Sequence, residues 1–124
     1  PRYISEMLKA SIEALSDPFN GIFGGVNVPV GGRWFYSNWF EFYAPSSAPG
    51  WIYHYEHGHL YVAGDAETIW LFEQRTGQWR YTTPDTYPSM FNPETGQWLY
   101  YVGRNGDNLR MFYNPGTGEW ILIF

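Results

Sequence analysis

Apolar and polar positions alternate along most of the chain from residue 51 onward, which predicts β-strands. The strands are short, rich in aromatic residues and separated by Gly, Pro, Asn and Asp. Each turn glycine has an aromatic residue five positions before it and a large apolar residue two positions after it. This pattern occurs at Gly58, Gly77, Gly96 and Gly118, about 20 residues apart. We therefore expect four repeated β-hairpins over residues 51–124.

The clearest hairpin spans residues 90–100. Pro93 presets φ for the first corner of a turn, and the Asn92 side chain can bond its own backbone. Gly96 can then adopt the left-handed conformation that closes a four-residue loop. Such a loop places Phe91 opposite Trp98. In the same way it pairs Phe72 with Trp79, Tyr113 with Trp120, Trp70 with Tyr81 and Ser89 with Tyr100.

Side chains alternate between the two faces of a sheet, so the paired aromatic residues share one face, which we expect to be the core. That face would carry Trp51, Tyr53, Leu60, Val62, Trp70, Phe72, Trp79, Tyr81, Phe91, Trp98, Tyr100, Met111, Tyr113, Trp120 and Leu122. The other face is polar near the turns and apolar further out. Short connections favour an antiparallel up-and-down sheet. The fold class is mainly β, arranged as a solenoid, a barrel or a propeller-like ring.

The first 50 residues differ from this pattern, within what we expect to be a single domain. Residues 1–16 contain one amphipathic helix, over 3–15, that either covers an open sheet face or links to a larger protein. Residues 17–50 form a Gly- and Pro-rich lead-in. Its Gly32–Tyr36 segment is a degenerate repeat whose partner strand is Val26–Val30. The chain begins at Pro1 without a signal peptide, so we expect a processed chain or a fragment.

The amino-acid composition argues against several kinds of function and site. The net charge is −5 with a single lysine, which argues against a nucleic-acid partner. No run of 18 apolar residues is present, so we expect no membrane span. The absence of cysteine excludes disulfides and thiolate metal sites.

The three histidines, His54, His57 and His59, lie at one predicted hairpin, with His54 and His59 as cross-strand neighbours and His57 in the turn. Three imidazoles near Glu56 would suit zinc or copper. They also occupy positions that are polar turn residues in the other hairpins, and we favour that interpretation. We therefore expect no metal and no cofactor.

The acidic residues do not indicate catalysis. Most lie at predicted turns: Asp65, Glu67, Asp85, Glu94 and Asp107. Glu41 and Glu73 lie on predicted strands without an evident partner, and no serine lies in a nucleophile motif. We expect that the chain is not an enzyme.

Aromatic residues outside the hairpin register are the better candidates for a binding site, since flat rings stack on the apolar faces of sugars as they do on bases. These residues are Trp39, Tyr43, Tyr55, Tyr87 and Tyr101. The expected partner is a polysaccharide or cell-wall glycan.

Two resemblances bear on function. The Gly-x-Trp-x-Tyr segments at residues 32–36 and 96–100 resemble the hairpins of choline-binding and glucan-binding repeat proteins, which are non-catalytic modules with aromatic cages. The resemblance implies a cage from Trp34, Tyr36, Trp79, Tyr81, Trp98, Tyr100 and Trp120. The Gly-Trp segments that link hairpins in that family are missing here.

Residues 34–124 more closely resemble an aromatic repeat domain near the C-termini of large bacterial secreted or surface proteins. The resemblance rests on Trp51-Ile52-Tyr53-His54, on His57-Gly58 and on the Thr-Gly-x-Trp hairpins. It implies an extracellular or cell-surface location and a non-enzymatic role. Two hypotheses follow. One is a carbohydrate- or cell-envelope-binding module. The other is a structural or adhesive subunit of a surface layer or filament that self-assembles through its strand edges as a homo-oligomer.

Overall fold

The computed structural model describes residues 17–29 and 32–123, which form one antiparallel sheet of eleven strands and one short helix. The helix is α2 (Asn20–Phe23). The strands are β1 (Val26–Asn27), β2 (Phe35–Ser37), β3 (Glu41–Pro45), β4 (Trp51–His54), β5 (Gly58–Gly64), β6 (Ile69–Glu73), β7 (Gln78–Thr82), β8 (Ser89–Asn92), β9 (Gln97–Arg104), β10 (Arg110–Asn114) and β11 (Glu119–Ile123). The helix predicted over residues 3–15 lies outside the described residues.

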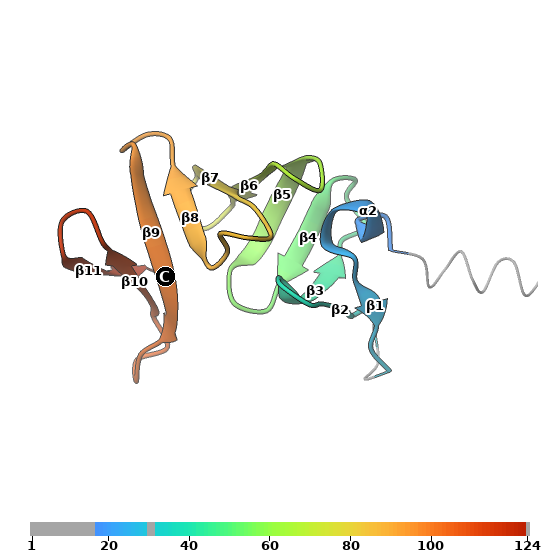
Figure 1. The fold of residues 1–124 in the computed structure, drawn as a ribbon. Coiled ribbons are helices and arrows are strands. Elements are labelled where there is room, and N and C mark those ends of the chain that lie inside the picture. Colours follow the sequence, from blue (N-terminus) through green and yellow to red (C-terminus); the bar gives the residue numbers. More distant parts are fainter. Residues whose placement is uncertain (1–16, 30–31, 124) are drawn as a thin grey trace, which may run out of the picture.

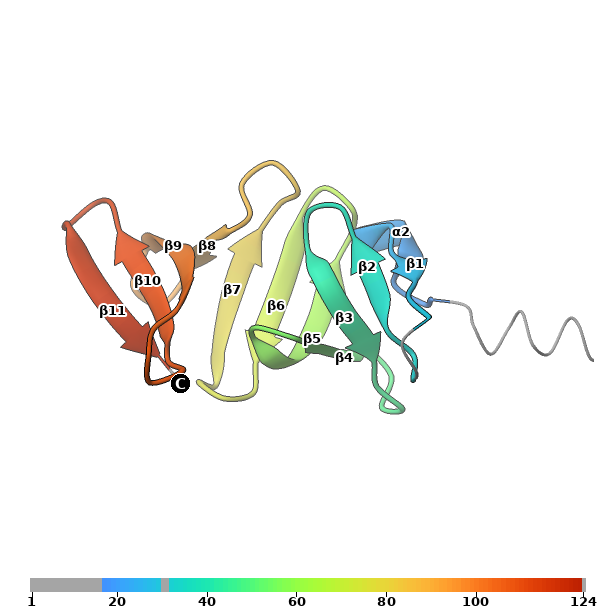
Figure 2. The ribbon, with the colours of Figure 1, turned by 90° about the horizontal axis from the view of Figure 1, so that it is seen from below.

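The strands follow one another across the sheet in chain order, from β1 to β11. Figures 1 and 2 show β1–β3 and α2 at one end of the molecule and β10–β11 at the other, with the strand direction turning along the sheet. The prediction of a mainly β, antiparallel up-and-down fold is confirmed. The sheet is open in the described part of the chain, so a closed barrel is not formed.

Three hairpins have the loop predicted from the Pro, Asn and Gly positions. Phe72 pairs with Trp79, Phe91 with Trp98 and Tyr113 with Trp120. The N–H groups of the turn glycines, Gly77, Gly96 and Gly118, each donate a 2.8 Å hydrogen bond to the carbonyl four residues earlier. All three glycines have φ between 67° and 75°, which favours glycine because it lacks Cβ. The predicted register of these hairpins is therefore confirmed.

The hairpin formed by β4 and β5 has a shorter loop. Only three residues, 55–57, separate the paired residues His54 and Gly58, so Tyr53 pairs with His59. The expectation that His54 and His59 are cross-strand neighbours is therefore wrong. A loop that is one residue shorter changes the register by one and moves every following side chain to the other face.

The buried face of the sheet is the opposite of the one expected. Its apolar members are Ile52, Leu60, Val62, Ile69, Leu71, Met90, Leu99 and Phe112. Leu60 and Val62 belong to this face because of the shorter loop of β4–β5. The aromatic residues face outward, and Trp79 and Trp98 remain 38% and 37% exposed. The coiling of the sheet encloses this face, where Arg80 and Arg110 are buried together with the apolar side chains, and leaves the hairpin rings outside.

The outward-facing rings form an outer aromatic row, defined here as Trp51, Tyr61, Phe72, Trp79, Trp70, Tyr81, Trp98 and Phe91. Neighbouring rings contact one another in tilted or T-shaped pairs with centroids 5.2–6.5 Å apart. Such pairs stabilise a sheet by roughly 0.2–1 kcal/mol each. The row therefore stabilises the hairpins although it lies outside the core.

Helix α2 covers the inside of the sheet at its β1–β4 end. Phe23 stacks on Phe40 with ring centroids 4.3 Å apart. The Asp17 carboxylate accepts hydrogen bonds from the Phe19 N–H, at 2.9 Å, and from the Tyr43 hydroxyl. These contacts close the first of two buried clusters, and the second surrounds Phe112.

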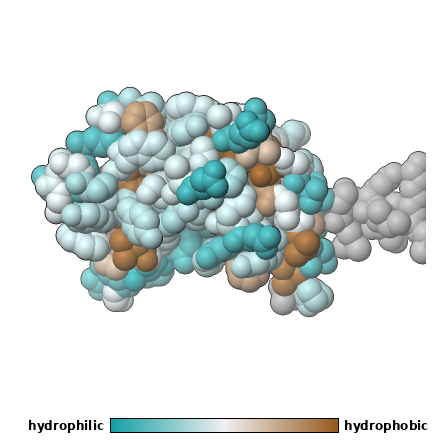
Figure 3. Space-filling model, viewed as in Figure 1, coloured by the Kyte–Doolittle hydropathy of each residue, from teal (hydrophilic) through white to brown (hydrophobic). Residues whose placement is uncertain are grey.

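The surface facing the viewer in Figure 3 is mostly hydrophilic or near neutral, with separate hydrophobic patches. In the described ranges 17–29 and 32–123, no helix has the length and hydrophobicity needed to cross a membrane.

Candidate functional site

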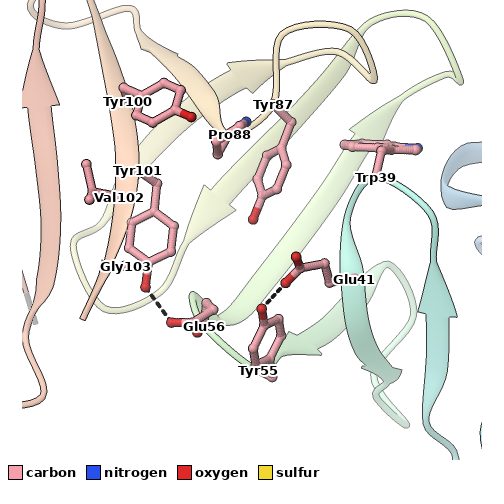
Figure 4. A pocket seen from close by; sticks show the side chains of 10 residues that line it. All are labelled: Trp39, Glu41, Tyr55, Glu56, Tyr87, Pro88, Tyr100, Tyr101, Val102 and Gly103. Atoms are coloured by element: carbon pink, nitrogen blue, oxygen red, sulfur yellow. Dashed lines mark hydrogen bonds between the residues drawn. The ribbon is translucent and has the colours of Figure 1, made fainter.

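A pocket of about 490 Å³ opens where three loops meet strand β9. Figure 4 shows the side chains that line it. They come from the β2–β3 loop, the start of β3, the β4–β5 turn, the β7–β8 loop and β9: Trp39, Glu41, Tyr55, Glu56, Tyr87, Pro88, Tyr100, Tyr101, Val102 and Gly103. We call it the acid–aromatic pocket.

Four of the five aromatic residues proposed from the sequence line this pocket, although they are far apart in the chain. Trp39, Tyr55, Tyr87 and Tyr101 come from three loops and one strand. Tyr43 does not belong to the site, because its side chain is 0% exposed beneath α2. Its position outside the hairpin register suggested exposure, but the sequence did not show that Phe23 of α2 packs against it.

Two carboxylates face the pocket, and each is held by a phenol (Figure 4). Glu41 Oε2 accepts a hydrogen bond from the Tyr55 hydroxyl, and Glu56 Oε2 accepts one from the Tyr101 hydroxyl. Arg104 Nε also donates to Glu56 Oε2, at 3.0 Å. Within residues 17–29 and 32–123, the Oε1 atoms of both glutamates accept no hydrogen bond. The pocket therefore offers two oriented acceptors to a ligand.

Glu41, which lacked an evident partner in the sequence, has an unusual backbone. Its φ is 71°, in the left-handed region that side chains other than Gly, Asn and Asp rarely adopt. The residue follows the three-residue loop between the paired residues Ser37 and Glu41. A glycine would relieve the strain at this position, but it would lack the carboxylate that accepts the hydrogen bond from Tyr55.

The Tyr87 ring packs against Trp39 and Phe40, with centroids 5.7 and 5.3 Å away. Its hydroxyl is 3.0 Å from His57 Nε2. Arg110 lies 2.8 Å from His57 Nδ1 and can only donate, so Nδ1 is the acceptor and Nε2 carries the proton. The Tyr87 oxygen thus accepts from His57.

The Tyr87 hydroxyl proton has no acceptor within the described chain, so it is available to a ligand. Burial is the main reason that the pKa of Tyr87 is raised, and the nearby Glu41 carboxylate acts in the same direction. The pKa of Tyr101 is raised by burial first and then by its hydrogen bond to Glu56. Both phenols therefore stay protonated at neutral pH and can act as hydrogen-bond donors.

His54 and His57 are buried side by side behind the pocket, with ring centroids 4.8 Å apart. His54 Nδ1 accepts from the backbone N–H groups of residues 56 and 57, so its Nε2 donates to the Phe40 carbonyl at 2.6 Å. Burial lowers the pKa of His54 to about 4 and holds the pKa of His57 well below its usual value. Both imidazoles are therefore neutral.

The histidines do not form a common metal site. Every ring nitrogen of His54 and His57 is used in a hydrogen bond, and His59 is exposed on the opposite face. No group of three His, Cys, Asp or Glu side chains in the described part of the chain could hold a metal ion. The two buried imidazoles instead support the pocket floor.

A buried ionic cluster lies behind these histidines. Glu73, the second acid without an evident sequence partner, accepts a 2.7 Å hydrogen bond from Arg110 and lies 3.7 Å from Arg80. All three side chains are at most 1% exposed. Arg80 Nε and Nη1 have no hydrogen-bond partner among the described residues. The cluster ties β6, β7 and β10 together and, through His57, fixes Tyr87.

The cage residues implied by the choline-binding resemblance lie elsewhere. Trp79, Tyr81, Trp98 and Trp120 are on the outer face of the hairpins, whereas Tyr100 lines the acid–aromatic pocket. Tyr81 and Trp98, with Trp70 and Phe91, line a shallow apolar pocket of about 290 Å³. That pocket is lined by aromatic side chains alone, whereas the acid–aromatic pocket combines rings with acceptors and a donor.

No protein-family model, no curated protein and no solved structure matches this chain. The two family resemblances remain predictions from the motifs, and function has to be argued from the site itself.

Proposed function

We propose that this chain is a non-catalytic module that binds a carbohydrate in the acid–aromatic pocket. The observation that carries the proposal is the meeting of Trp39, Tyr55, Tyr87 and Tyr101 around two carboxylates. The four rings come from separate parts of the chain, so the pocket is a product of the tertiary fold.

The chemistry of the pocket is complementary to that of a sugar. The C–H face of a pyranose ring is apolar and stacks on aromatic side chains, whereas its hydroxyl groups are donors and acceptors. Glu41 and Glu56 supply acceptors, and the Tyr87 hydroxyl supplies a donor. A volume of about 490 Å³ lies within the roughly 300–1,000 Å³ typical of small-ligand pockets.

The proposal also includes the extracellular or cell-surface location and the repeated hairpins that the sequence led us to expect. The matched registers of β6–β7, β8–β9 and β10–β11 support their origin as copies of one unit of about 20 residues. The resemblance to a repeat domain of bacterial secreted proteins supports an extracellular or cell-surface role, where the partner is a polysaccharide or cell-wall glycan.

A glycan array tests this function. Wild-type protein and the Trp39→Ala variant are applied to bacterial, algal and plant glycans, with Trp120→Ala as a control. Trp120 is exposed on β11, outside the pocket. We expect selective binding by the wild type and the control, and its loss in Trp39→Ala. Binding that survives Trp39→Ala but is lost in Trp120→Ala would place the site on the outer face.

The edge strand β11 favours a second candidate, a self-assembling structural subunit. Trp120 and Leu122 are 61% and 54% exposed on β11, which has one neighbouring strand, β10, among residues 17–29 and 32–123. A strand edge of this kind is a template for pairing with another chain. Sedimentation velocity over a hundredfold concentration range tests this candidate. Assembly that Leu122→Lys abolishes would support it, and a monomer at all concentrations would exclude it.

A further inference from the structure

A second pocket adjoins the acid–aromatic pocket. Its volume is about 560 Å³, and its lining is Tyr53, Tyr55, Arg75, Arg104, Asp107, Asn108 and Leu109. Tyr55 lines both pockets, so its ring lies between them. Whereas the first pocket contains two carboxylates, the second contains two guanidinium groups. We call it the arginine pocket.

Arg104 is fully engaged within the protein. Its Nε donates to Glu56 Oε2 at 3.0 Å, its Nη1 donates to the Asn108 carbonyl at 2.8 Å, and its Nη2 donates to the Glu56 carbonyl. The Glu56 carboxylate offsets its charge. Arg104 therefore lines the arginine pocket and positions Glu56, which lines the acid–aromatic pocket, instead of presenting a free positive charge.

Arg75 is the available cation of the arginine pocket. It lies in the β6–β7 turn, and in the described part of the chain its guanidinium group has neither an ion pair nor a hydrogen bond. A Cβ atom at Gly58 would come within 3.0 Å of Arg75 Nε and 3.2 Å of its Cζ. Glycine at position 58, where φ is 76°, thus lets the guanidinium group lie close over the backbone. A guanidinium group binds carboxylates and sulfates through two parallel hydrogen bonds.

Asp107 adds a negative charge to the arginine pocket. It lines the same pocket but forms no ion pair with Arg75 or Arg104 among residues 17–29 and 32–123. A negatively charged ligand would be attracted by Arg75 and repelled by Asp107. Removal of the Arg75 charge should therefore weaken the binding of an anionic ligand, and removal of the Asp107 charge should strengthen it.

We infer that the binding site extends past Tyr55 into the arginine pocket, and that the sugar unit bound there carries an anionic group. This inference rests on the proposed function, since it assigns a second subsite to the same glycan. The neighbouring unit, in the acid–aromatic pocket, carries no negative charge, because Glu41 and Glu56 would repel one. The anionic group is a carboxylate, as in a uronic acid, or a sulfate ester.

Titration calorimetry with paired oligosaccharides tests this subsite. The ligands are a hexuronate oligosaccharide with alternating neutral units, its carboxyl-reduced counterpart and a sulfated oligosaccharide of the same length. We expect the wild type to bind one anionic ligand more tightly than the neutral one. Arg75→Gln should weaken that binding about tenfold and leave neutral-ligand binding within about twofold. Asp107→Asn should strengthen it about threefold.

The control variant is Arg33→Gln, which removes one positive charge outside both pockets and should leave all three affinities unchanged. A preference for the carboxylate or for the sulfate identifies the group. Equal affinity of the wild type for all three ligands would overturn the arginine subsite while leaving the proposed carbohydrate function intact. Binding of none of the three, together with an empty glycan array, would overturn both.

Discussion

Arg110 on β10 donates a 2.7 Å hydrogen bond to Glu73 on β6, although β7, β8 and β9 separate these strands in the sheet. The contact is possible because the sheet coils and its inner face packs against itself. The same arginine reaches His57 Nδ1 in the β4–β5 turn. Through Tyr87, this inner cluster determines the shape of the acid–aromatic pocket on the surface.

Glu73 is therefore expected to be important for stability. Glu73→Gln removes the buried carboxylate that lies between Arg80 and Arg110, which should lower the free energy of unfolding by about 3 kcal/mol or more. Urea denaturation measures the change. Glu119→Gln, an exposed acid on β11, is the matched control and should change it by less than about 0.5 kcal/mol. Equal stability of the two variants would refute the buried ionic cluster.

The buried histidines predict a stability that falls in mild acid. In the unfolded chain a histidine has a pKa near 6.5, whereas folded His54 stays neutral down to about pH 4. The unfolded state thus binds more protons between these values, and stability decreases as pH falls. From pH 7.5 to 5.0 the free energy of unfolding should drop by about 2 kcal/mol for His54, and His57 acts in the same direction.

Urea denaturation at several pH values measures this dependence. The His54→Gln variant should lose about half of the pH-dependent change, because one of the two buried imidazoles is removed. A wild-type stability that does not differ between pH 7.5 and 5.0 would show that the imidazoles are not held neutral in the folded state.

The close contact between Gly25 and Tyr43 makes the stability of the protein sensitive to substitution of Gly25. A Cβ atom at residue 25 would lie 2.8 Å from Tyr43 Cζ and 3.0 Å from Asp17 Oδ2, so Gly25→Ala must push Tyr43 from its hydrogen bond. Overpacking of this kind costs about 1–3 kcal/mol. In Gly21→Ala, the control, the new Cβ has no atom within 4 Å, and thermal unfolding should show an unchanged or higher Tm. Equal Tm values would mean that α2 does not pack as described.

Substitution of Glu41 should affect glycan binding and stability in opposite directions. Glu41→Gly removes the strain of a positive φ and should keep or raise the free energy of unfolding, by up to about 1 kcal/mol. The same change removes a carboxylate from the acid–aromatic pocket and should weaken glycan binding at least about tenfold. Chemical denaturation and titration calorimetry on one protein sample measure both effects. Unchanged glycan affinity would remove Glu41 from the site.

Local features of the fold were predictable from the sequence because they depend on turn chemistry. Pro93, Asn92 and Gly96 correctly predicted a four-residue loop and the pairing of Phe91 with Trp98. The Asn92 side chain accepts the Glu94 N–H at 2.9 Å, as expected. At the His54 turn the same alignment failed, because nothing in the glycine spacing indicates that the loop there is one residue shorter.

The buried face was not predictable from hydrophobicity alone. Both faces carry apolar residues, and the heavier aromatic face looked like the core. Which side is inside depends on how the sheet coils, and this is decided by contacts such as Glu73 with Arg110 between distant strands. The candidate site was likewise only partly predictable from the sequence. Its rings were identified by their departure from the hairpin pattern, whereas Glu41 and Glu56 became visible only once the loops were placed.

The central claim is that a glycan binds in the acid–aromatic pocket, and the indole N–H signals of the seven tryptophans test it most directly. Of the tryptophans, all of which lie in the described part of the chain, Trp39 alone lines the pocket. In a ¹H–¹⁵N spectrum titrated with neutral and uronate-containing oligosaccharides, the Trp39 indole signal should shift progressively and saturate, while those of Trp79, Trp98 and Trp120 stay in place. Shifts confined to the outer-face tryptophans, or no shift with any glycan, would contradict the account.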